Sequence, residues 1–280
     1  MKFQRLLSIS RPRFWIYILG PFLLGVIAAG DPRLWTLELS LLVLAFFIFF
    51  TFPANLLIYG VNDIFDYETD KLNPKKQEYE ELIHPNDQKK LWKYIYLICL
   101  PFLLLFFFVE DYVLLLSSIF LIVSLQYSAT PIRAKAQPPL DIIFSSLIYI
   151  SPAVIGFSIA NGTDISWYAV ISALLWAAAM QTYSAVPDIS ADTQAGVSTL
   201  ATVLGAKRSL LFCFLAYFAS AVIAFQYIGF LAIILGCIYL AMVAVSYYSK
   251  EVFFWYKKFP LINTIAGMSI FFYLALSFVF

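Results

Sequence analysis

Long, nearly uncharged stretches of apolar residues recur along the chain, and they restrict its fold more than any other feature. Two of them cover residues 37–59 and 167–186. A bilayer core about 30 Å thick takes roughly 20 helical residues to cross, and several stretches reach that length. The chain is 62% hydrophobic and 12% charged, whereas soluble domains average roughly 45–50% and 25%. We therefore expect an all-α integral membrane protein.

Polar breaks between the apolar stretches predict nine transmembrane helices. We expect them to form one transmembrane domain, residues 1–280, around a central cavity. Their expected positions are residues 13–30, 37–61, 91–109, 111–128, 139–160, 165–186, 207–227, 229–248 and 260–279.

The basic residues are distributed very unevenly over this topology. With nine crossings, the N-terminus and the loops after the second, fourth, sixth and eighth helices share one side of the membrane. All but one of the chain's 18 Lys and Arg residues fall on that side, and the exception is Arg33. Because basic loops stay in the cytoplasm, we expect this face, with the N-terminus and the cavity mouth, to be the cytoplasmic side of the cell inner membrane.

The three cysteines offer no metal or redox site. Cys99, Cys213 and Cys237 each stand alone in an apolar stretch, without CxxC spacing. Such residues usually pack as small apolar side chains. Membrane topology accounts for most of the basic residues, so no nucleic-acid partner is expected.

The second apolar stretch ends in what we call the first acidic segment, residues 62–70. Within it Asn62, Asp66 and Asp70 recur every four residues, a spacing that places them on one side of a helix. Asn55 and Tyr59 continue this stripe back into the apolar stretch. A polar amide is costly there, so its presence indicates a role. Asp63 lies about 100° off the stripe, so we rank it below the others.

The sixth apolar stretch ends in a second acidic segment, residues 186–192. Asp188 and Asp192 are again four residues apart, and Gln181 and Ser184 extend their side into the membrane. Asp188 follows Asp66 by 122 residues, and Asp192 follows Asp70 by the same number. The second segment comes four expected helices after the first, and an even number of crossings places both segments on the same face of the membrane. This spacing suggests a duplicated four-helix unit, about residues 13–128 and 139–248, followed by a ninth helix.

The two acidic segments together predict a metal site. Carboxylates at this spacing repel one another unless a cation lies between them, and ionisable groups at a membrane cavity are costly enough to indicate function. Mg²⁺ is usually held by a few carboxylates together with substrate phosphate oxygens. One such segment alone is more often a solvated helix end, but two on one face favour Mg²⁺ and a phosphorylated ligand.

The loop after the fourth helix supplies cations on the same face. Arg133 and Lys135 follow Tyr127 and Ser128 there. Arginine forks and lysine point charges both suit phosphate. Topology alone would explain two basic residues on this loop, but their position beside the acidic segments favours a role in phosphate binding. Arg11, on the same face, is a further candidate.

The chain resembles the UbiA superfamily of intramembrane prenyltransferases over nearly its whole length. The family motif NxxxDxxxD is met by Asn62, Asp66 and Asp70, and the motif DxxxD by Asp188 and Asp192. The loop from Tyr127 and Ser128 to Arg133 and Lys135 resembles the family's YS…K/R loop, in the longer form of chlorophyll synthases and carotenoid-elongating members. Residues 61–76 and 185–199 look most like lycopene elongases, whereas residues 136–139 follow no subfamily pattern.

This resemblance implies Mg²⁺-dependent transfer of a prenyl group from an allylic prenyl diphosphate to a hydrophobic acceptor such as lycopene, in carotenoid biosynthesis. The expected partners are the prenyl diphosphate, the lipophilic acceptor and the lipid bilayer. By the resemblance, the catalytic residues are Asp66, Asp70, Asp188 and Asp192, the metal ligands are these four with Asn62, and the substrate-binding residues are Tyr127, Ser128, Arg133, Lys135 and Arg11.

Two kinds of alternative stay open. A 4-hydroxybenzoate-like aromatic, a chlorin or a glycerol lipid would fit the same motifs as acceptor, and the motifs do not fix the donor's chain length. A cation-coupled transporter is the alternative from another class, because such proteins also carry buried acids and internal repeats. Transporter sites usually lie near the midplane on broken helices, whereas these carboxylates lie at helix ends.

Overall fold

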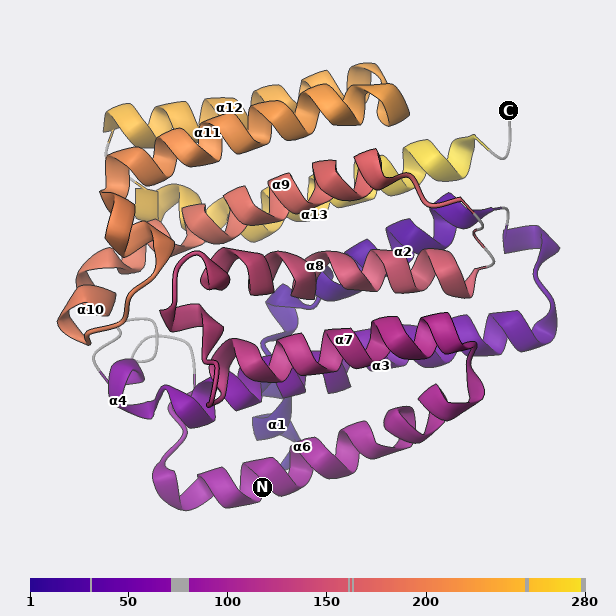
Figure 1. Cartoon of the computed structure of the whole chain (residues 1–280), viewed down its shortest axis with the longest axis horizontal. Coiled ribbons are helices and arrows are strands. Elements are labelled where there is room, and N and C mark those ends of the chain that lie inside the picture. Colours follow the sequence, from indigo (N-terminus) through magenta and orange to yellow (C-terminus); the bar gives the residue numbers. More distant parts are fainter. Residues whose placement is uncertain (31, 72–80, 161, 163, 250–251, 278–280) are drawn as a thin grey trace. The chain divides into compact units, whose positions relative to one another are not determined.

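The computed structural model describes residues 1–30, 32–71, 81–160, 162, 164–249 and 252–277. The described part of the chain consists of helices and their connections and contains no strand (Figure 1). The long helices are α2 (Ile16–Ala29), α3 (Leu37–Phe65), α6 (Pro85–Leu105), α7 (Asp111–Ser128), α8 (Leu140–Ile159), α9 (Trp167–Ala185), α11 (Leu200–Ile228), α12 (Phe230–Ser249) and α13 (Val252–Leu276). The short helices are α1 (Phe3–Ile9), α4 (Tyr67–Asp70) and α10 (Ile189–Gln194).

Within the described ranges, nine helical segments are long and apolar enough to cross a membrane. This agrees with the number expected from the sequence, although several ends differ. The segment Leu200–Ile228 begins before the expected residue 207. Its first turn is capped reciprocally, since Thr199 Oγ1 accepts from the Thr202 amide and Thr202 Oγ1 accepts from the Thr199 amide. Gly205, at φ 72° and ψ 163°, kinks the helix inside this segment, so the expected start at residue 207 lies just after the kink.

The sixth expected helix also runs further than the apolar stretch. After α9 the chain makes a 3₁₀ turn, Val186–Asp188, and then forms α10. Proline has no amide hydrogen for the helical ladder, and Pro187 lies in the middle of this turn. The second acidic segment therefore begins where the regular α-helix ends.

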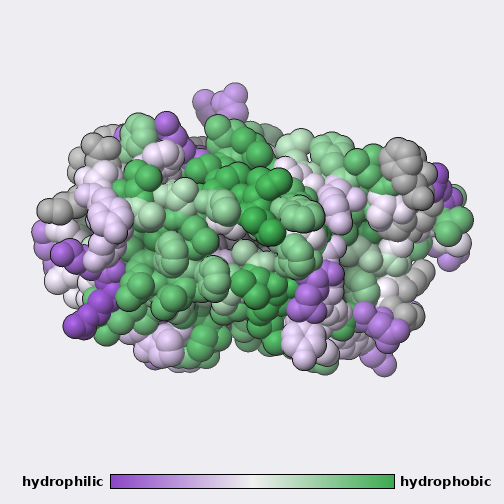
Figure 2. Space-filling model, turned by 90° about the horizontal axis from the view of Figure 1, so that it is seen from above, coloured by the Kyte–Doolittle hydropathy of each residue, from purple (hydrophilic) through white to green (hydrophobic). Residues whose placement is uncertain are grey.

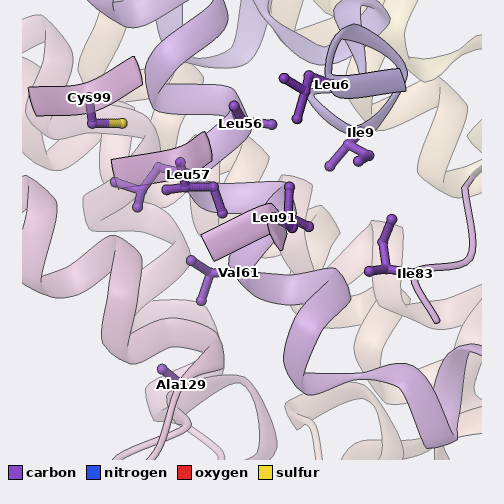
Figure 3. Packing of buried hydrophobic residues seen from close by; sticks show 10 residues of the cluster. Leu6, Ile9, Leu56, Leu57, Val61, Ile83, Leu91, Cys99 and Ala129 are labelled. Atoms are coloured by element: carbon purple, nitrogen blue, oxygen red, sulfur yellow. The ribbon is translucent and has the colours of Figure 1, made fainter. Parts of the chain in front are cut away.

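The structure comprises two compact units, Met1–Arg133 with Ser151–Thr163, and Ala134–Ile150 with Asp164–Phe280. In the first unit, α1 packs its apolar side on α3 and α6 (Figure 3). Burial of these side chains fixes the N-terminal helix beside the end of α3 that carries the first acidic segment. The buried cluster consists of Leu6, Ile9, Leu56, Leu57, Val61, Ile83, Leu91, Ile95, Cys99 and Ala129.

Two glycines allow α2 and the later part of α8 to approach closely in the first unit. A Cβ at Gly25 would collide with the carbonyl group of Ala153, and one at Gly156 would collide with the carbonyl oxygen of Phe22. Small residues at such crossings let helix backbones touch, which favours packing between membrane helices.

In the second unit, hydroxyl groups join the helices across their buried faces. Ser172 on α9 donates to the carbonyl oxygen of Ser220 on α11 at 2.9 Å, and Ser220 Oγ donates to the carbonyl oxygen of Ser172 at 2.8 Å. Tyr239 on α12 donates to Asn263 Oδ1 on α13 at 2.7 Å. Interhelical hydrogen bonds of this kind hold membrane helices in register.

Apolar side chains are also abundant on the outside of both units. Hydrophobic residues dominate the surface in view in Figure 2. Leu34, Phe108, Phe230 and Tyr248 are among the large apolar or aromatic side chains with more than three quarters of their surface exposed. Exposed apolar surface of this extent suits contact with lipid and not with water.

Candidate active site

The first acidic segment keeps its helical spacing although α3 ends inside it. Helix α3 stops at Phe65, Asp66 follows it, and α4 covers Tyr67–Asp70. The Asp66 amide donates to the Asn62 carbonyl oxygen at 3.0 Å, and the Asp70 amide donates to the Asp66 carbonyl oxygen at 2.7 Å. Asn62, Asp66 and Asp70 therefore lie one helical turn apart, as the sequence predicts. Asp66 and Asp70 are both buried, at 8% and 7% exposure.

The end of α7 brings a hydroxyl group and a guanidinium to this stripe. Ser128 Oγ donates to Asn62 Oδ1 at 3.1 Å. Arg133 Nη2 donates to Asp66 Oδ1 at 3.2 Å, which makes an ion pair. Four residues that the sequence assigns to the site, from helices far apart in the chain, are therefore assembled within the first unit.

Asp63 holds a second guanidinium beside the same segment. Arg11 Nη2 donates to Asp63 Oδ1 at 2.7 Å, and the guanidinium lies 4.7 Å from the centre of the Tyr59 ring. Asp63 is almost fully buried, at 1% exposure. Arg11 thus reaches the acidic segment through the aspartate that was ranked below the others, and this ion pair is a contact that the four-residue spacing missed.

Arg11 and Arg133 both adopt a backbone conformation that residues other than glycine rarely take. In the described chain, Arg11 (φ 52°) and Arg133 (φ 47°) are the two non-glycine residues with positive φ. Such conformations cost on the order of 1–3 kcal/mol and persist where the surroundings impose them. Each arginine pairs with an aspartate of the first acidic segment, so the strain occurs where cations and carboxylates are placed together.

The other predicted site residues lie on different elements. Asp188 ends the 3₁₀ turn after α9, and Asp192 lies in α10, both half-buried in the second unit. Lys135 is half-buried in the 3₁₀ turn Ala134–Ala136 of the same unit. Tyr127 is half-buried in the last turn of α7, in the first unit. Ser184, expected to extend the second stripe, donates to the Met180 carbonyl oxygen at 2.8 Å.

The donor set suits Mg²⁺ shared with a substrate. Across the residues that the structure describes, no three His, Cys, Asp or Glu side chains gather to hold a metal by themselves. Mg²⁺ does not need such a cage, because it usually binds one or two carboxylates together with phosphate oxygens and water. Asp66 with Asp70 in one unit, and Asp188 with Asp192 in the other, are carboxylate pairs of that kind.

Asp141 is a further buried carboxylate near the predicted substrate loop. It lies in the first turn of α8 at 3% exposure, and its Oδ2 accepts from the Leu200 amide at 2.7 Å, at the start of α11. The side chain thereby satisfies an amide that the helix itself leaves unpaired. An acid at the start of an apolar stretch, two residues after Pro139, is a signal that sequence reasoning could have used.

Comparison with known proteins identifies the family of the chain. Residues 18–249 match the model of the UbiA prenyltransferase family. A lycopene elongase/hydratase of Haloarcula japonica is 38% identical over 276 residues, which cover 94% of this chain and 88% of that protein. A lycopene elongase/hydratase of Corynebacterium glutamicum is 35% identical, over 79% of this chain and 77% of its own.

Solved structures share the fold. The structure of a UbiA homolog from Archaeoglobus fulgidus bound to GPP and Mg²⁺ has a TM-score of 0.72 with this chain. The match covers 97% of this chain and 99% of that one, at 18% identity. The family match over most of the chain, the close relatives and the nine long apolar helices lead to one conclusion: the chain belongs to the UbiA prenyltransferase family and is an integral membrane prenyltransferase.

Proposed function

We propose that this protein transfers a prenyl group from an allylic prenyl diphosphate to a carotenoid acceptor such as lycopene, in a reaction that requires Mg²⁺. The observation that carries the proposal is the pair formed by Asp66 and Arg133, a buried metal-type carboxylate beside a phosphate-type cation. Relatives that are 33–38% identical over most of the chain, named lycopene elongase/hydratase, support the carotenoid acceptor.

The diphosphate would bind through Mg²⁺ held by the carboxylates and through the cations of the basic loop. Asn62, Asp66 and Asp70 would hold one Mg²⁺, and Asp188 with Asp192 a second. Mg²⁺ bound there supplies charge neutralisation to the leaving diphosphate. Ser128 donates a hydrogen bond to Asn62 Oδ1, the oxygen that would bind the ion, and so orients this side chain.

The cations of the site would share the remaining charge of the diphosphate. Arg133 balances Asp66 in the structure described above, and an arriving diphosphate offers its guanidinium a second, stronger anion. Lys135 and Tyr127 come from the same loop and helix end, and Arg11 approaches from the side of Asp63. Diphosphate departure leaves an allylic cation, which an apolar surrounding protects from bulk water.

We place the site at the cytoplasmic face of the cell inner membrane, in a cavity that a lipophilic acceptor enters from the bilayer. The charge bias of the loops supports this orientation. Labelling of single introduced cysteines in intact cells tests it. A membrane-impermeant thiol reagent should react with Arg33→Cys from outside, and with Lys207→Cys only after the membrane is opened. The reverse pattern would contradict the orientation.

The activity test uses the purified protein in detergent. Dimethylallyl and geranylgeranyl diphosphate are supplied with lycopene or 4-hydroxybenzoate, with and without Mg²⁺, and products are identified by mass spectrometry. We expect a prenylated lycopene that forms only with Mg²⁺. Asp66→Asn and Asp188→Asn should each lower turnover by about 10²-fold or more, because each removes charge that stabilises the transition state.

The matched control is Asp111→Asn. It makes the same chemical change at an exposed residue in the first turn of α7, outside the acidic segments, and should retain full activity. A prenylated 4-hydroxybenzoate in place of prenylated lycopene would overturn the acceptor but keep the reaction class. Turnover that is independent of Mg²⁺, or unchanged in both variants, would refute the proposed site.

A further inference from the structure

Asn55 is a buried amide in the apolar part of α3, and its oxygen has no hydrogen-bond donor in the part of the chain that the structure describes. Its side chain is fully buried, at 0% exposure. Nδ2 donates to the carbonyl oxygen of Phe50 at 3.0 Å and also to that of Thr51. Among the described residues, Oδ1 has no hydrogen-bond partner. With both amide hydrogens bound to backbone oxygens, the orientation of the amide is fixed, and the free acceptor is the oxygen.

Asn55 belongs to the stripe of the active site. It precedes Asn62 by two helical turns, about 10 Å along the helix axis, and points within about 20° of the same direction. Asn62 and Asp66 mark the level of the diphosphate under the proposed function. A prenyl chain attached to that diphosphate extends away from the charged end of α3, toward the apolar level at which Asn55 lies.

Helix α7 adds a second buried polar group at this depth. Ser128, Ser124 and Ser117 share one side of α7 by their spacing, and Ser128 faces the stripe through its bond to Asn62. Ser124 and Ser117 are each 1% exposed, and neither hydroxyl has a partner among the described residues. Ser124 lies one turn from Ser128, on the same membrane side of the diphosphate level as Asn55.

A buried carbonyl oxygen without a donor is costly, so the chemistry of the ligands restricts what Asn55 can bind. A prenyl chain and a carotene are hydrocarbons and carry no donor, and the diphosphate carries acceptors. The small donor that fits is water, which typically binds buried polar groups that the protein leaves unsatisfied. Ser124 Oγ, which is also buried without a partner among the described residues, would be a second polar partner for such a molecule.

We propose that Asn55 positions the water molecule that adds to the acceptor cation, and that it thereby sets the ratio of hydrated to unhydrated product. The proposal rests on the proposed function. The bond between the allylic carbon and the diphosphate oxygen breaks, and the diphosphate keeps the electron pair. The acceptor's double bond then forms the new carbon–carbon bond and leaves a cation on its adjacent carbon.

Two outcomes compete for this second cation. Loss of a proton from a neighbouring carbon gives an unhydrated alkene. Attack by water forms a carbon–oxygen bond, and the extra proton of the water passes to the released diphosphate. A water whose hydrogen points to Asn55 Oδ1 presents a lone pair to the cation, so Asn55 is a positioning residue that acts through this water.

The test compares Asn55→Val with Asn55→Thr. The two side chains have nearly the same shape, but threonine has a hydroxyl group where valine has a methyl group. Threonine can donate to the carbonyl four residues earlier, as Thr182 does to Ala178, and can still accept from water. The full-length protein is incubated with dimethylallyl diphosphate, lycopene and Mg²⁺ in H₂¹⁸O. Donor consumption and the fraction of product that carries ¹⁸O are measured by mass spectrometry.

We expect Asn55→Val to lower the ¹⁸O-labelled fraction about tenfold, the effect of losing one hydrogen bond to the reacting water, while donor consumption stays within about threefold. Asn55→Thr should restore most of the labelled fraction. Ser124→Ala is the second variant and should lower it as well. Its control is Ser118→Ala on the same helix, because the Ser118 hydroxyl already donates to the Leu114 carbonyl oxygen at 2.8 Å.

The inference would be overturned if Asn55→Val, Asn55→Thr and Ser124→Ala all gave the same labelled fraction as the wild type. Active wild-type protein whose product carries no ¹⁸O would overturn it too, while the proposed function stood. Absence of Mg²⁺-dependent donor consumption in the wild type would instead refute the proposed function, and the inference would fall with it. The outcomes therefore separate the two proposals.

Discussion

Arg133 donates a 3.2 Å hydrogen bond to the carboxylate of Asp66, so the loop after α7 rests on the first acidic segment. The pair is held by a residue in a strained backbone conformation, since Arg133 has φ 47°. Under the proposed function, the same guanidinium leaves Asp66 and binds the diphosphate when the substrate arrives. The ion pair then holds Arg133 close to its place before the ligand arrives.

This exchange predicts a graded effect of substitutions at Arg133. Arg133→Ala should lower kcat/KM for dimethylallyl diphosphate by about 10²-fold, because one donor to the diphosphate is lost. Arg133→Lys should recover part of the loss, since lysine supplies the charge but not the fork of donors. The measurement is kcat/KM at saturating lycopene and Mg²⁺. Lys207→Ala, at an exposed lysine of α11, is the control, and equal values for all variants would contradict the assignment.

The ion pair of Arg11 with Asp63 predicts a stability effect that depends on which partner is removed. Asp63 is 1% exposed, so Arg11→Ala removes a cation from a buried carboxylate and should lower the free energy of unfolding by about 3 kcal/mol. Replacing both residues, with Arg11→Ala and Asp63→Leu, should cost less than Arg11→Ala alone, because the buried charge is then gone. Thermal unfolding in detergent measures both. A double variant less stable than Arg11→Ala would show that Asp63 is held by other groups.

The close crossing of α2 and α8 predicts that Gly25 does not tolerate a methyl group. Gly25→Ala would place a Cβ against the carbonyl of Ala153, and neither backbone can yield without moving its helix. We expect loss of more than about 3 kcal/mol of stability, at or beyond the upper range for overpacking. Gly267→Ala in α13 is the matched control, because a Cβ there meets nothing within 4 Å. Equal melting temperatures for the two variants would contradict this packing.

Much of the fold and the stripe of the first acidic segment could be predicted because both depend on local periodicity. Apolar length locates the membrane helices, and four-residue spacing locates Asn62, Asp66 and Asp70 on one side. Apolar length also misplaces ends, as at α6, which begins at Pro85 and not at residue 91. Its first turns carry Asp87 and several lysines, so they are helical without being apolar.

The contacts between distant residues could not be predicted in the same way. Arg11 and Asp63 are 52 residues apart, and no spacing rule joins a turn after α1 to the end of α3. Their pairing depends on how α1 packs against α3, which is decided by buried side chains such as Leu6 and Leu56. The same holds for Asp141 and Leu200, 59 residues apart.

Asp141 provides the last prediction, because its carboxylate caps α11 from another helix. Asp141→Ala should leave the part-buried Leu200 amide without its acceptor and cost about 1–3 kcal/mol. Asp141→Asn keeps a side-chain oxygen and should recover most of that loss. The local readout is the rate of tryptic cleavage at Lys207 and Arg208, just after the kink of α11 at Gly205, which should rise in Asp141→Ala.

Glu110→Ala is the control for this variant, since Glu110 occupies the N-cap position of α7 without making a side-chain cap. Its melting temperature and cleavage pattern should match the wild type. If Asp141→Ala and Asp141→Asn destabilise the protein equally, the negative charge and not the hydrogen bond to Leu200 holds the start of α11. If neither does, α11 is held there by its own cap, formed by Thr199 and Thr202.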